Sequence, residues 1–130
     1  MAARIHNPAG IAPPRAAYSH AAALAGPHRV LHSAGQVGRK PDGTIPPDFR
    51  GQVEAVWDNL ETILAANAMT LADIVKINFF LTDADDVVAN REAFARRLGP
   101  EFRPTTTLLV IKALAQPALK IEAEIVAAAN

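Results

Sequence analysis

The sequence predicts a single α+β domain, and three observations point to this fold class. Half of the 130 residues are hydrophobic, which is enough apolar material for one core. Short segments typical of strands are interspersed with two longer segments whose apolar residues recur every three or four positions, as on one face of a helix. Neither an internal repeat nor a linker is evident, so we expect one domain over residues 1–130.

The N-terminal part of the chain predicts an irregular arm, two strands and a loop. Three prolines make residues 6–15 irregular, because proline lacks a backbone donor and restricts the residue before it. Residues 18–24 and 29–34 are predicted strands, separated by a turn at Gly26-Pro27. Residues 38–47 contain two glycines and three prolines, which predicts a loop.

A first helix is predicted after this loop. Asp48 stands at its start, where an aspartate can cap free backbone N–H groups and favours the positive end of the helix. Thr70 then precedes a short helical turn over residues 71–73, with the spacing of a capping box. The apolar stripe that defines the helix comprises Val53, Val56, Trp57, Leu60, Ile63 and Leu64.

The rest of the chain predicts a strand (74–82), a helix (83–98) ended by Gly99-Pro100, and two strands (105–114 and 119–127). Because each helix joins two strands, both should form right-handed crossovers and lie on one face of the sheet. The residues expected to share an inner face are Val75, Ile77, Phe79 and Leu81 on the strand and Val87, Val88, Phe94 and Leu98 on the helix.

The strand at 105–114 carries apolar residues on both faces, at positions 108–111. Two helices on one side leave the other face of the sheet uncovered, and an apolar face needs a cover. We therefore expect self-association, with sheets packing against sheets. The alternative is a strand that is simply buried within a monomer.

Charge and composition exclude several classes of partner. Thirteen basic and thirteen acidic residues cancel, so no long-range field attracts nucleic acid or an anionic membrane, and we expect neither as a partner. No segment approaches the roughly 20 apolar residues that span a bilayer, and no signal peptide is evident, which predicts a cytoplasmic protein. The chain has no cysteine and its four histidines lack zinc-site spacing, so we expect neither a metal nor another cofactor.

Several short motifs occur in a fixed order over nearly the whole chain. They are Tyr18-Ser19-His20-Ala21, Ala34-Gly35-Gln36-Val37, residues 75–81, Ala89-Asn90-Arg91 with Phe94, Phe102-Arg103-Pro104 and Ile121-Glu122-Ala123-Glu124. No single motif is specific, but the ordered set resembles the Rid family, also called YjgF or RidA. This resemblance implies a chorismate-mutase-like fold and a homotrimer, with the sheets lining a central barrel and small-molecule clefts at the subunit interfaces.

The resemblance also implies a chemistry. Active members hydrolyse 2-imino or 2-enamino acids to 2-keto acids and ammonia, and an arginine binds the substrate carboxylate through two parallel hydrogen bonds. In this chain Thr105 occupies the place expected for that arginine, three residues after Phe102. Arg103 lies two positions earlier and is a candidate replacement, although a structural or solubilising role, or another ligand, is the favoured account of it. Ala34 replaces the family serine at the Gly-Gln turn.

The remaining candidate site residues each have a second, purely structural interpretation. Glu122 matches the glutamate that positions the water, or is a solvated strand carboxylate. Tyr18 matches a cleft-lining residue, or is a half-buried aromatic. Gly35 matches a position near the substrate carboxylate, or serves a tight turn. Asn90 matches a polar family position, or is a solvent-facing or packing residue.

The run Thr105 to Thr107 would line a neutral cleft, or reflects strand propensity alone. Two functions are therefore carried forward. The first is a diverged Rid-family hydrolase, deaminase-like, that acts on a small imine, enamine or related C–N compound with Glu122 as its catalytic residue. The second is a non-enzymatic trimer that binds a small metabolite or a partner protein.

Overall fold

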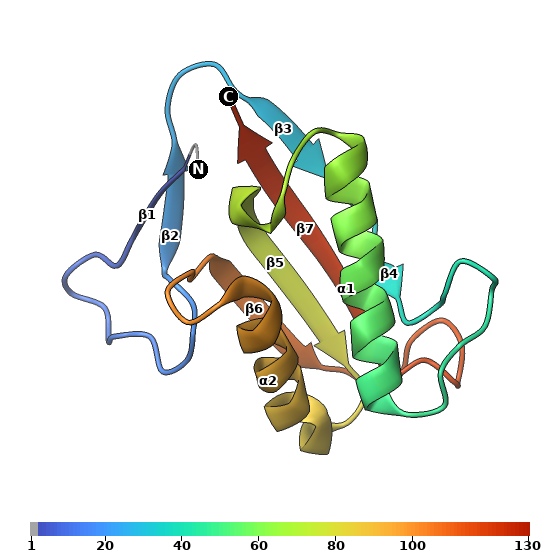
Figure 1. Cartoon of the computed structure of the whole chain (residues 1–130). Coiled ribbons are helices and arrows are strands. Elements are labelled where there is room, and N and C mark those ends of the chain that lie inside the picture. The colour runs from blue at the N-terminus through green and yellow to red at the C-terminus, as the bar shows by residue number, and fades with distance from the viewer. Residues whose placement is uncertain (1–2) are drawn as a thin grey trace.

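The computed structural model describes residues 3–130 (Figure 1). Its strands are β1 (Ala3–His6), β2 (Ala21–Leu24), β3 (Arg29–His32), β4 (Gln36–Val37), β5 (Ile74–Leu81), β6 (Thr105–Val110) and β7 (Ile121–Ala129). The α-helices are α1 (Phe49–Ala66) and α2 (Val87–Leu98), and two single 3₁₀ turns, Leu71–Asp73 and Ala84–Asp86, precede β5 and α2. The fold is α+β, as predicted.

The main sheet is mixed and has the order β3-β7-β5-β6, with β4 also pairing with β7. β7 is antiparallel to β3, β4 and β5, whereas β5 and β6 are parallel neighbours joined through α2. β1 and β2 form a separate antiparallel pair that stands to one side of this sheet (Figure 1). An isolated bridge between Ser19 and Thr105 links the N-terminal arm to the start of β6.

Both helices cover the same face of the main sheet, and the core lies beneath them (Figure 1). Alternation along the strands supplies the sheet side of this core: Ile77, Phe79 and Leu81 of β5, and Ile121, Ala123, Ile125 and Ala127 of β7, are all buried. The predicted stripe of α1 supplies most of the other side, since all of its members except Ile63 are buried. Among the described residues no helix is long and apolar enough to cross a membrane.

Several element predictions need correction. β1 lies in a segment for which no strand was predicted, because four residues are too few to show a period. The strand predicted over 105–114 ends at Val110, and the helix predicted over 83–98 begins as a 3₁₀ turn. Val88 was predicted to face inward but is 63% exposed, whereas Asn90 occupies the inner face and is only 2% exposed.

The predicted caps are confirmed. The side chain of Asp48 accepts a hydrogen bond from the backbone N–H of Gly51 at 3.0 Å. Thr70 and Asp73 form a reciprocal capping box, with the Thr70 N–H donating to Asp73 Oδ2 at 2.8 Å. Each cap satisfies backbone donors that the first turn of a helix leaves free.

The fully buried side chain of Gln52 connects two loops to α1 through hydrogen bonds. Its Nε2 donates to the carbonyls of Pro46 (2.9 Å) and Ala118 (2.8 Å), and its Oε1 accepts from the Lys120 N–H at 2.8 Å. All three partners are backbone groups of irregular segments, which have no ladder of their own to join. One side chain therefore holds both the segment before α1 and the segment before β7.

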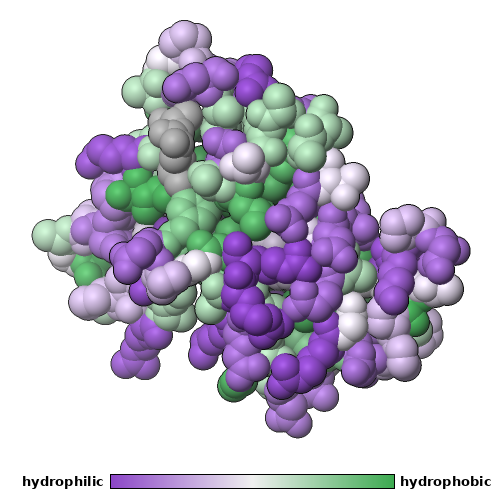
Figure 2. Space-filling model, in the orientation of Figure 1, coloured by the Kyte–Doolittle hydropathy of each residue, from purple (hydrophilic) through white to green (hydrophobic). Residues whose placement is uncertain are grey.

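Charged side chains of the two helices form a network on the outer surface, where Figure 2 shows hydrophilic residues gathered over the helices. Arg97 contacts Glu54 (2.6 Å), Asp58 (2.9 Å) and Glu61 (2.6 Å), and Arg96 contacts Glu54 at 2.7 Å. Hydrogen bonds from Arg97 and then Arg96 hold the pKa of Glu54 below its ordinary value. The network ties α2 to α1 across the outside of the core.

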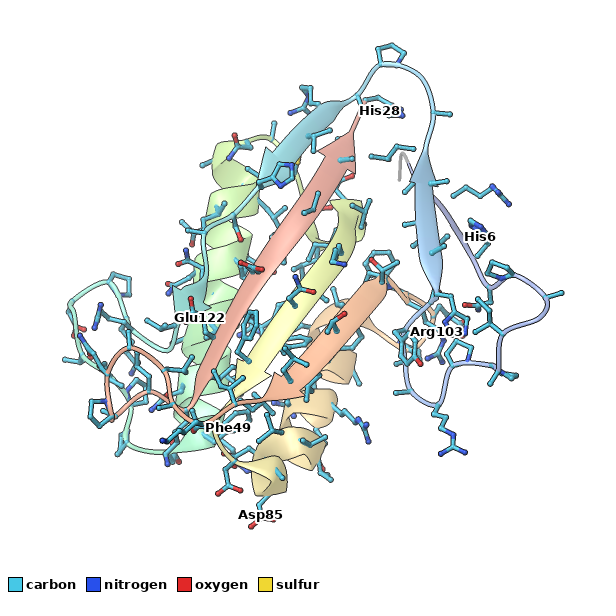
Figure 3. All side chains as sticks on the ribbon, turned by 180° about the vertical axis from the view of Figure 1, so that it is seen from behind. His6, His28, Phe49, Asp85, Arg103 and Glu122 are labelled. Carbon is cyan, nitrogen blue, oxygen red and sulfur yellow. The ribbon has the colours of Figure 1, made fainter. Side chains whose placement is uncertain are left out.

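The opposite face of the sheet carries no helix among the described residues, as the view from behind shows (Figure 3). By register this face presents Lys76, Asn78, Phe80, Thr105, Thr107, Leu109, Glu122, Glu124, Val126 and His32. It mixes apolar and polar groups, and Leu109 is 48% exposed. The uncovered face is thus observed, while the predicted association of copies through it stays a prediction.

We expect Gln52→Leu to lower the free energy of unfolding by about 2–4 kcal/mol, because it removes one buried and two partly buried hydrogen bonds. Denaturant titration measures this loss. Gln116→Leu is the control, since Gln116 is exposed and the one hydrogen bond that its side chain makes within residues 3–130 is from Arg39, and we expect it to change stability by less than about 0.5 kcal/mol. Equal effects of the two substitutions would contradict the role given to Gln52.

We expect the Glu54 pairing to stabilise the protein in a pH-dependent way. Because its folded-state pKa is lowered, the stabilisation is present above its ordinary pKa of 4.5 and is lost as the pH falls through the folded-state pKa. Glu54→Gln should therefore cost about 0.5–1 kcal/mol at pH 7 and progressively less as the pH is lowered, measured by urea unfolding over a series of pH values. Glu101→Gln, at an exposed residue outside the network, should show no such difference.

Candidate functional site

A cavity of about 500 Å³ lies where the N-terminal arm passes the edge strand β6 and the helix α2. This volume is in the range of small-molecule sites. Three segments far apart in sequence form its walls: residues 15–18 of the arm, residues 90–94 of α2 and residues 106–108 of β6, with Phe79 of β5 beneath them.

The floor of the cavity is the edge of an aromatic cluster. Phe79 and Phe94 line the cavity, their ring centroids lie 6.1 Å apart, and each ring lies 6.2 Å from that of Trp57 in the core. Edge-on and tilted arrangements at these distances are favourable for aromatic rings. The floor is therefore rigid and apolar, and the sole tryptophan of the chain packs directly behind it.

Asn90 is a buried polar residue in the wall of this cavity. It is 2% exposed, it lines the cavity, and its Oδ1 is buried without a hydrogen-bond partner among the described residues. A buried acceptor without a partner costs about 1–3 kcal/mol, so such groups are rare in folded proteins. A ligand that donates an N–H or O–H to this oxygen would remove that cost.

The charged groups around the cavity are all cationic. Arg15 and Arg91 line it, and neither a carboxylate nor a histidine does. A second hollow of about 390 Å³ adjoins it and shares Arg15, Ala16 and Tyr18 with it. Arg103 lines this second hollow, again without a carboxylate. Tyr18 thus lies between two hollows that carry only positive charge.

The three consecutive threonines have different positions relative to the cavity. The Thr105 hydroxyl donates to the Val75 carbonyl at 2.6 Å, so it completes the junction of β6 with β5 and does not line the cavity. Thr106 and Thr107 do line it. The position that we assigned to the family arginine therefore lies beside the cavity wall and not in it, and whether an arginine has been lost stays a prediction.

Glu122 and Gly35 lie together at a different place. Glu122 is on β7, opposite Val37 of β4 and Phe80 of β5, on the uncovered face of the sheet. A Cβ added to Gly35 would overlap the carboxylate of Glu122, so the absence of a side chain there leaves room for that carboxylate. Figure 3 shows Glu122 toward the β4 side of the sheet and Arg103 at the opposite side, beside the N-terminal arm.

Gly35 also borders a third hollow of about 440 Å³ between the loop after β4 and α1. Arg39, Lys40 and Asn59 line it as well. Asn59 Nδ2 donates to the Arg39 carbonyl at 3.0 Å, and Arg39 donates to Gln116 at 2.9 Å. These side chains are therefore engaged in holding the loop.

Within one protomer the predicted site residues thus fall into separate groups. Tyr18, Asn90 and Thr107 meet in the first cavity, Arg103 lies in the hollow next to it, and Gly35 with Glu122 lies on the far side of β7. The charged residues of the cavity, Arg15 and Arg91, were not predicted. Nothing in the sequence marks Arg15, because its arm has no period, whereas Arg91 directly follows Asn90 in a motif already singled out.

No group of three or more His, Cys, Asp or Glu side chains with metal-site geometry occurs in residues 3–130. Among these residues the acidic groups near α2 act instead at its start. Burial, reinforced by Asp83 and Asp85, raises the pKa of Asp86 above its ordinary value. The Asp83 side chain accepts from the Asp85 N–H at 2.8 Å and so caps the 3₁₀ turn.

The mixed sheet with two helices on one face defines a chorismate-mutase-like α+β protein. The crystal structure of YyfB from Yersinia pestis, a protein of unknown function of the conserved Rid family, superposes with a TM-score of 0.86 over 98% of each chain at 27% identity. The family model described as "Endoribonuclease L-PSP" matches residues 10–129. The chain therefore belongs to this family, which is the Rid or YjgF family.

Three curated relatives extend this comparison. The chain is 44% identical over 57 residues, 44% of each chain, to the RutC family protein YjgH of Escherichia coli K12. It is 31% identical to the mitochondrial protein mmf2 of Schizosaccharomyces pombe, over 76% of this chain and 79% of mmf2. It is 29% identical over 66 residues, about half of each chain, to TdcF of Escherichia coli K12, by name a candidate reactive intermediate deaminase. The compartment of this chain stays a prediction, since mmf2 is mitochondrial by name.

We expect Asn90→Leu to leave the free energy of unfolding unchanged or to raise it by about 1 kcal/mol, because it removes a buried acceptor that has no partner. Thermal unfolding measures this. Asn78→Leu is the matched control: Asn78 Nδ2 donates to Glu124 Oε1 at 3.2 Å, so the same change there should destabilise the protein. A marked loss of stability for Asn90→Leu would mean that the amide is satisfied in the folded protein.

Proposed function

We propose that this chain forms a homotrimer whose inter-subunit clefts bind a small imine, enamine or related C–N compound and hydrolyse it. The observation that carries the proposal is the 500 Å³ cavity with its apolar aromatic floor and the unsatisfied amide of Asn90. Tyr18 covers one side of this cavity, and Thr106 and Thr107 line another. Family membership and the name of the relative TdcF support the choice of reaction.

The reaction needs groups of three kinds: donors or cations for a carboxylate, a wall that holds the carbon skeleton, and a base for water. Arg15 and Arg91 supply the first kind, because a guanidinium binds a carboxylate through parallel hydrogen bonds. Phe79, Phe94 and Tyr18 supply the second. The third kind does not line the cavity of one protomer, where neither a carboxylate nor a histidine is found among the described residues.

Glu122 is our proposed base, and the trimer is the reason that it can serve the cavity. It projects from the uncovered sheet face, which is the face that association of copies would bury. A neighbouring subunit that packs there would bring its Tyr18 cavity against Glu122. Gly35 would then offer its backbone to the same cleft, since it has no side chain in the way.

The proposed chemistry is addition of water across the C=N bond followed by loss of ammonia. Glu122 takes a proton from water as the oxygen bonds to the imine carbon, and it returns that proton to the nitrogen. The C–N bond of the resulting carbinolamine then breaks as the proton of its hydroxyl passes to the departing nitrogen, which leaves a C=O group and ammonia. The overall balance is one C=NH group and one water giving one C=O group and one NH₃.

The second candidate is a trimer that binds a small metabolite without turning it over. The absence of an acid or base from the described lining of the cavity favours it. Ribonuclease activity, which the description of the family names, is not proposed here, because the chain has no net charge to gather a polyanion. The expectation of no nucleic-acid partner stays a prediction.

We expect the wild-type chain to accelerate hydrolysis of a 2-imino acid generated in situ by an amino-acid oxidase, followed as loss of the imine. Glu122→Gln should lower this rate by at least about 10²-fold, the scale of general acid–base catalysis, while leaving binding intact. Glu124→Gln is the matched control, because Glu124 shares the same strand and face but accepts a hydrogen bond from Asn78. Light scattering on each variant checks that it is a trimer.

Each outcome separates the two candidates. Turnover that depends on Glu122 and not on Glu124 supports the hydrolase. A trimer that binds small carboxylates without turnover supports the binder. A monomer at micromolar concentration would refute the shared cleft, and with it both functions in the form proposed.

A further inference from the structure

Three arginines surround Tyr18 without an acidic partner. Arg15 lines both hollows beside Tyr18, Arg91 lines the larger one and Arg103 the smaller one. Within residues 3–130 none of the three forms an ion pair or donates a side-chain hydrogen bond. In contrast, the arginines on the outer faces of the helices are paired: Arg50 contacts Glu92 at 3.6 Å, and Arg96 and Arg97 both contact Glu54.

This concentration of charge is local and uncompensated. The chain as a whole carries thirteen basic and thirteen acidic residues, yet the two hollows are lined by three cations and no anion. Like charges gathered around one cleft repel one another and raise the local positive potential. An anionic ligand in the cleft would relieve this repulsion.

The arrangement favours a ligand with two anionic groups. The hollows are separate but share Arg15, Ala16 and Tyr18, so a ligand that spans both would lie across Tyr18. One anionic group would be held by Arg91 in the larger hollow and the other by Arg103 in the smaller one. Arg15 borders both hollows and can serve either group.

The larger hollow adds a requirement for a hydrogen-bond donor. Asn90 lines this hollow, and its Oδ1 is buried without a hydrogen-bond partner among the described residues. Since amide oxygens only accept hydrogen bonds, the ligand must present an N–H or O–H there. A carboxylate close to an N–H group is the α-amino or α-imino acid pattern, so the second anion would be the side-chain carboxylate.

We propose that the two hollows beside Tyr18 together select small dicarboxylates that carry an amino or imino nitrogen, and that Arg103 binds the second carboxylate. The selection uses the same cavity as the proposed hydrolase, and in that sense rests on it, but it requires binding and not turnover. Arg103 is then a specificity residue, and the substrates are acidic and not neutral imino acids.

The test compares L-glutamate with L-glutamine, which have the same skeleton and differ by one negative charge. Binding is measured by calorimetry, and in parallel by the fluorescence of Trp57, whose ring packs behind Phe79 and Phe94 at the floor. We expect glutamate to bind at least about tenfold more tightly than glutamine, and the advantage to shrink as salt is added. Glutarate, which lacks the nitrogen, should bind more weakly than glutamate.

Two charge-matched substitutions locate the effect. Arg103→Gln should bring the preference for glutamate down to less than about threefold while leaving glutamine binding unchanged. Arg4→Gln removes the same charge from an exposed position on β1 that lines neither hollow, and the preference should survive it. Both arginines are exposed, so both variants should fold like the wild type.

Equal binding of glutamate and glutamine by the wild type, or binding of neither, would overturn the inference. So would a preference that Arg103→Gln and Arg4→Gln weaken equally, because net charge alone would then explain it. Imine hydrolysis without any preference for dicarboxylates would refute the inference and leave the proposed function standing. A preference for glutamate without hydrolysis would support the inference and refute the proposed hydrolase.

Discussion

The contact among Trp57, Phe79 and Phe94 is the constraint on which both the fold and the cavity depend. These three rings come from α1, β5 and α2, and each lies about 6 Å from the other two. Because the rings are large, rigid and buried, they fix how far α2 stands from the sheet. The same two phenylalanines form the floor of the cavity, so the packing that stabilises the core also sets the depth of the candidate site.

Around this centre, polar groups are arranged in two contrasting ways. Gln52 is buried and makes three hydrogen bonds to backbone, which is how a folded chain ordinarily treats a buried amide. Asn90 is equally buried, yet its Oδ1 has no partner within the described part of the chain. The difference separates a structural amide from one that faces a cavity, and it is the reason for placing ligand chemistry at α2 and not at α1.

The arginines likewise fall into two groups, those paired with carboxylates and those without an acidic partner. On the outside of the helices, Arg96 and Arg97 are engaged by carboxylates, and this pairing keeps the pKa of Glu54 low. Around Tyr18 the arginines have no such partners among residues 3–130. A chain with no net charge can therefore still present a local positive site, because neutrality is a property of the sum and not of each surface.

The sequence by itself determined the layers of this protein. The period of α1 and the alternation of β5 are local patterns that burial enforces, so the stripe from Val53 to Leu64 and the inner face of β5 could be predicted. The cavity could not, because it is formed by three segments that only tertiary packing brings together: an arm without a period, an edge strand and the inner face of α2. Tertiary packing also decided that Asn90 of α2 is buried and Val88 is exposed. It separated Glu122 from Tyr18 within one protomer, because the pairing of β7, β5 and β6 decides which side chains lie close together.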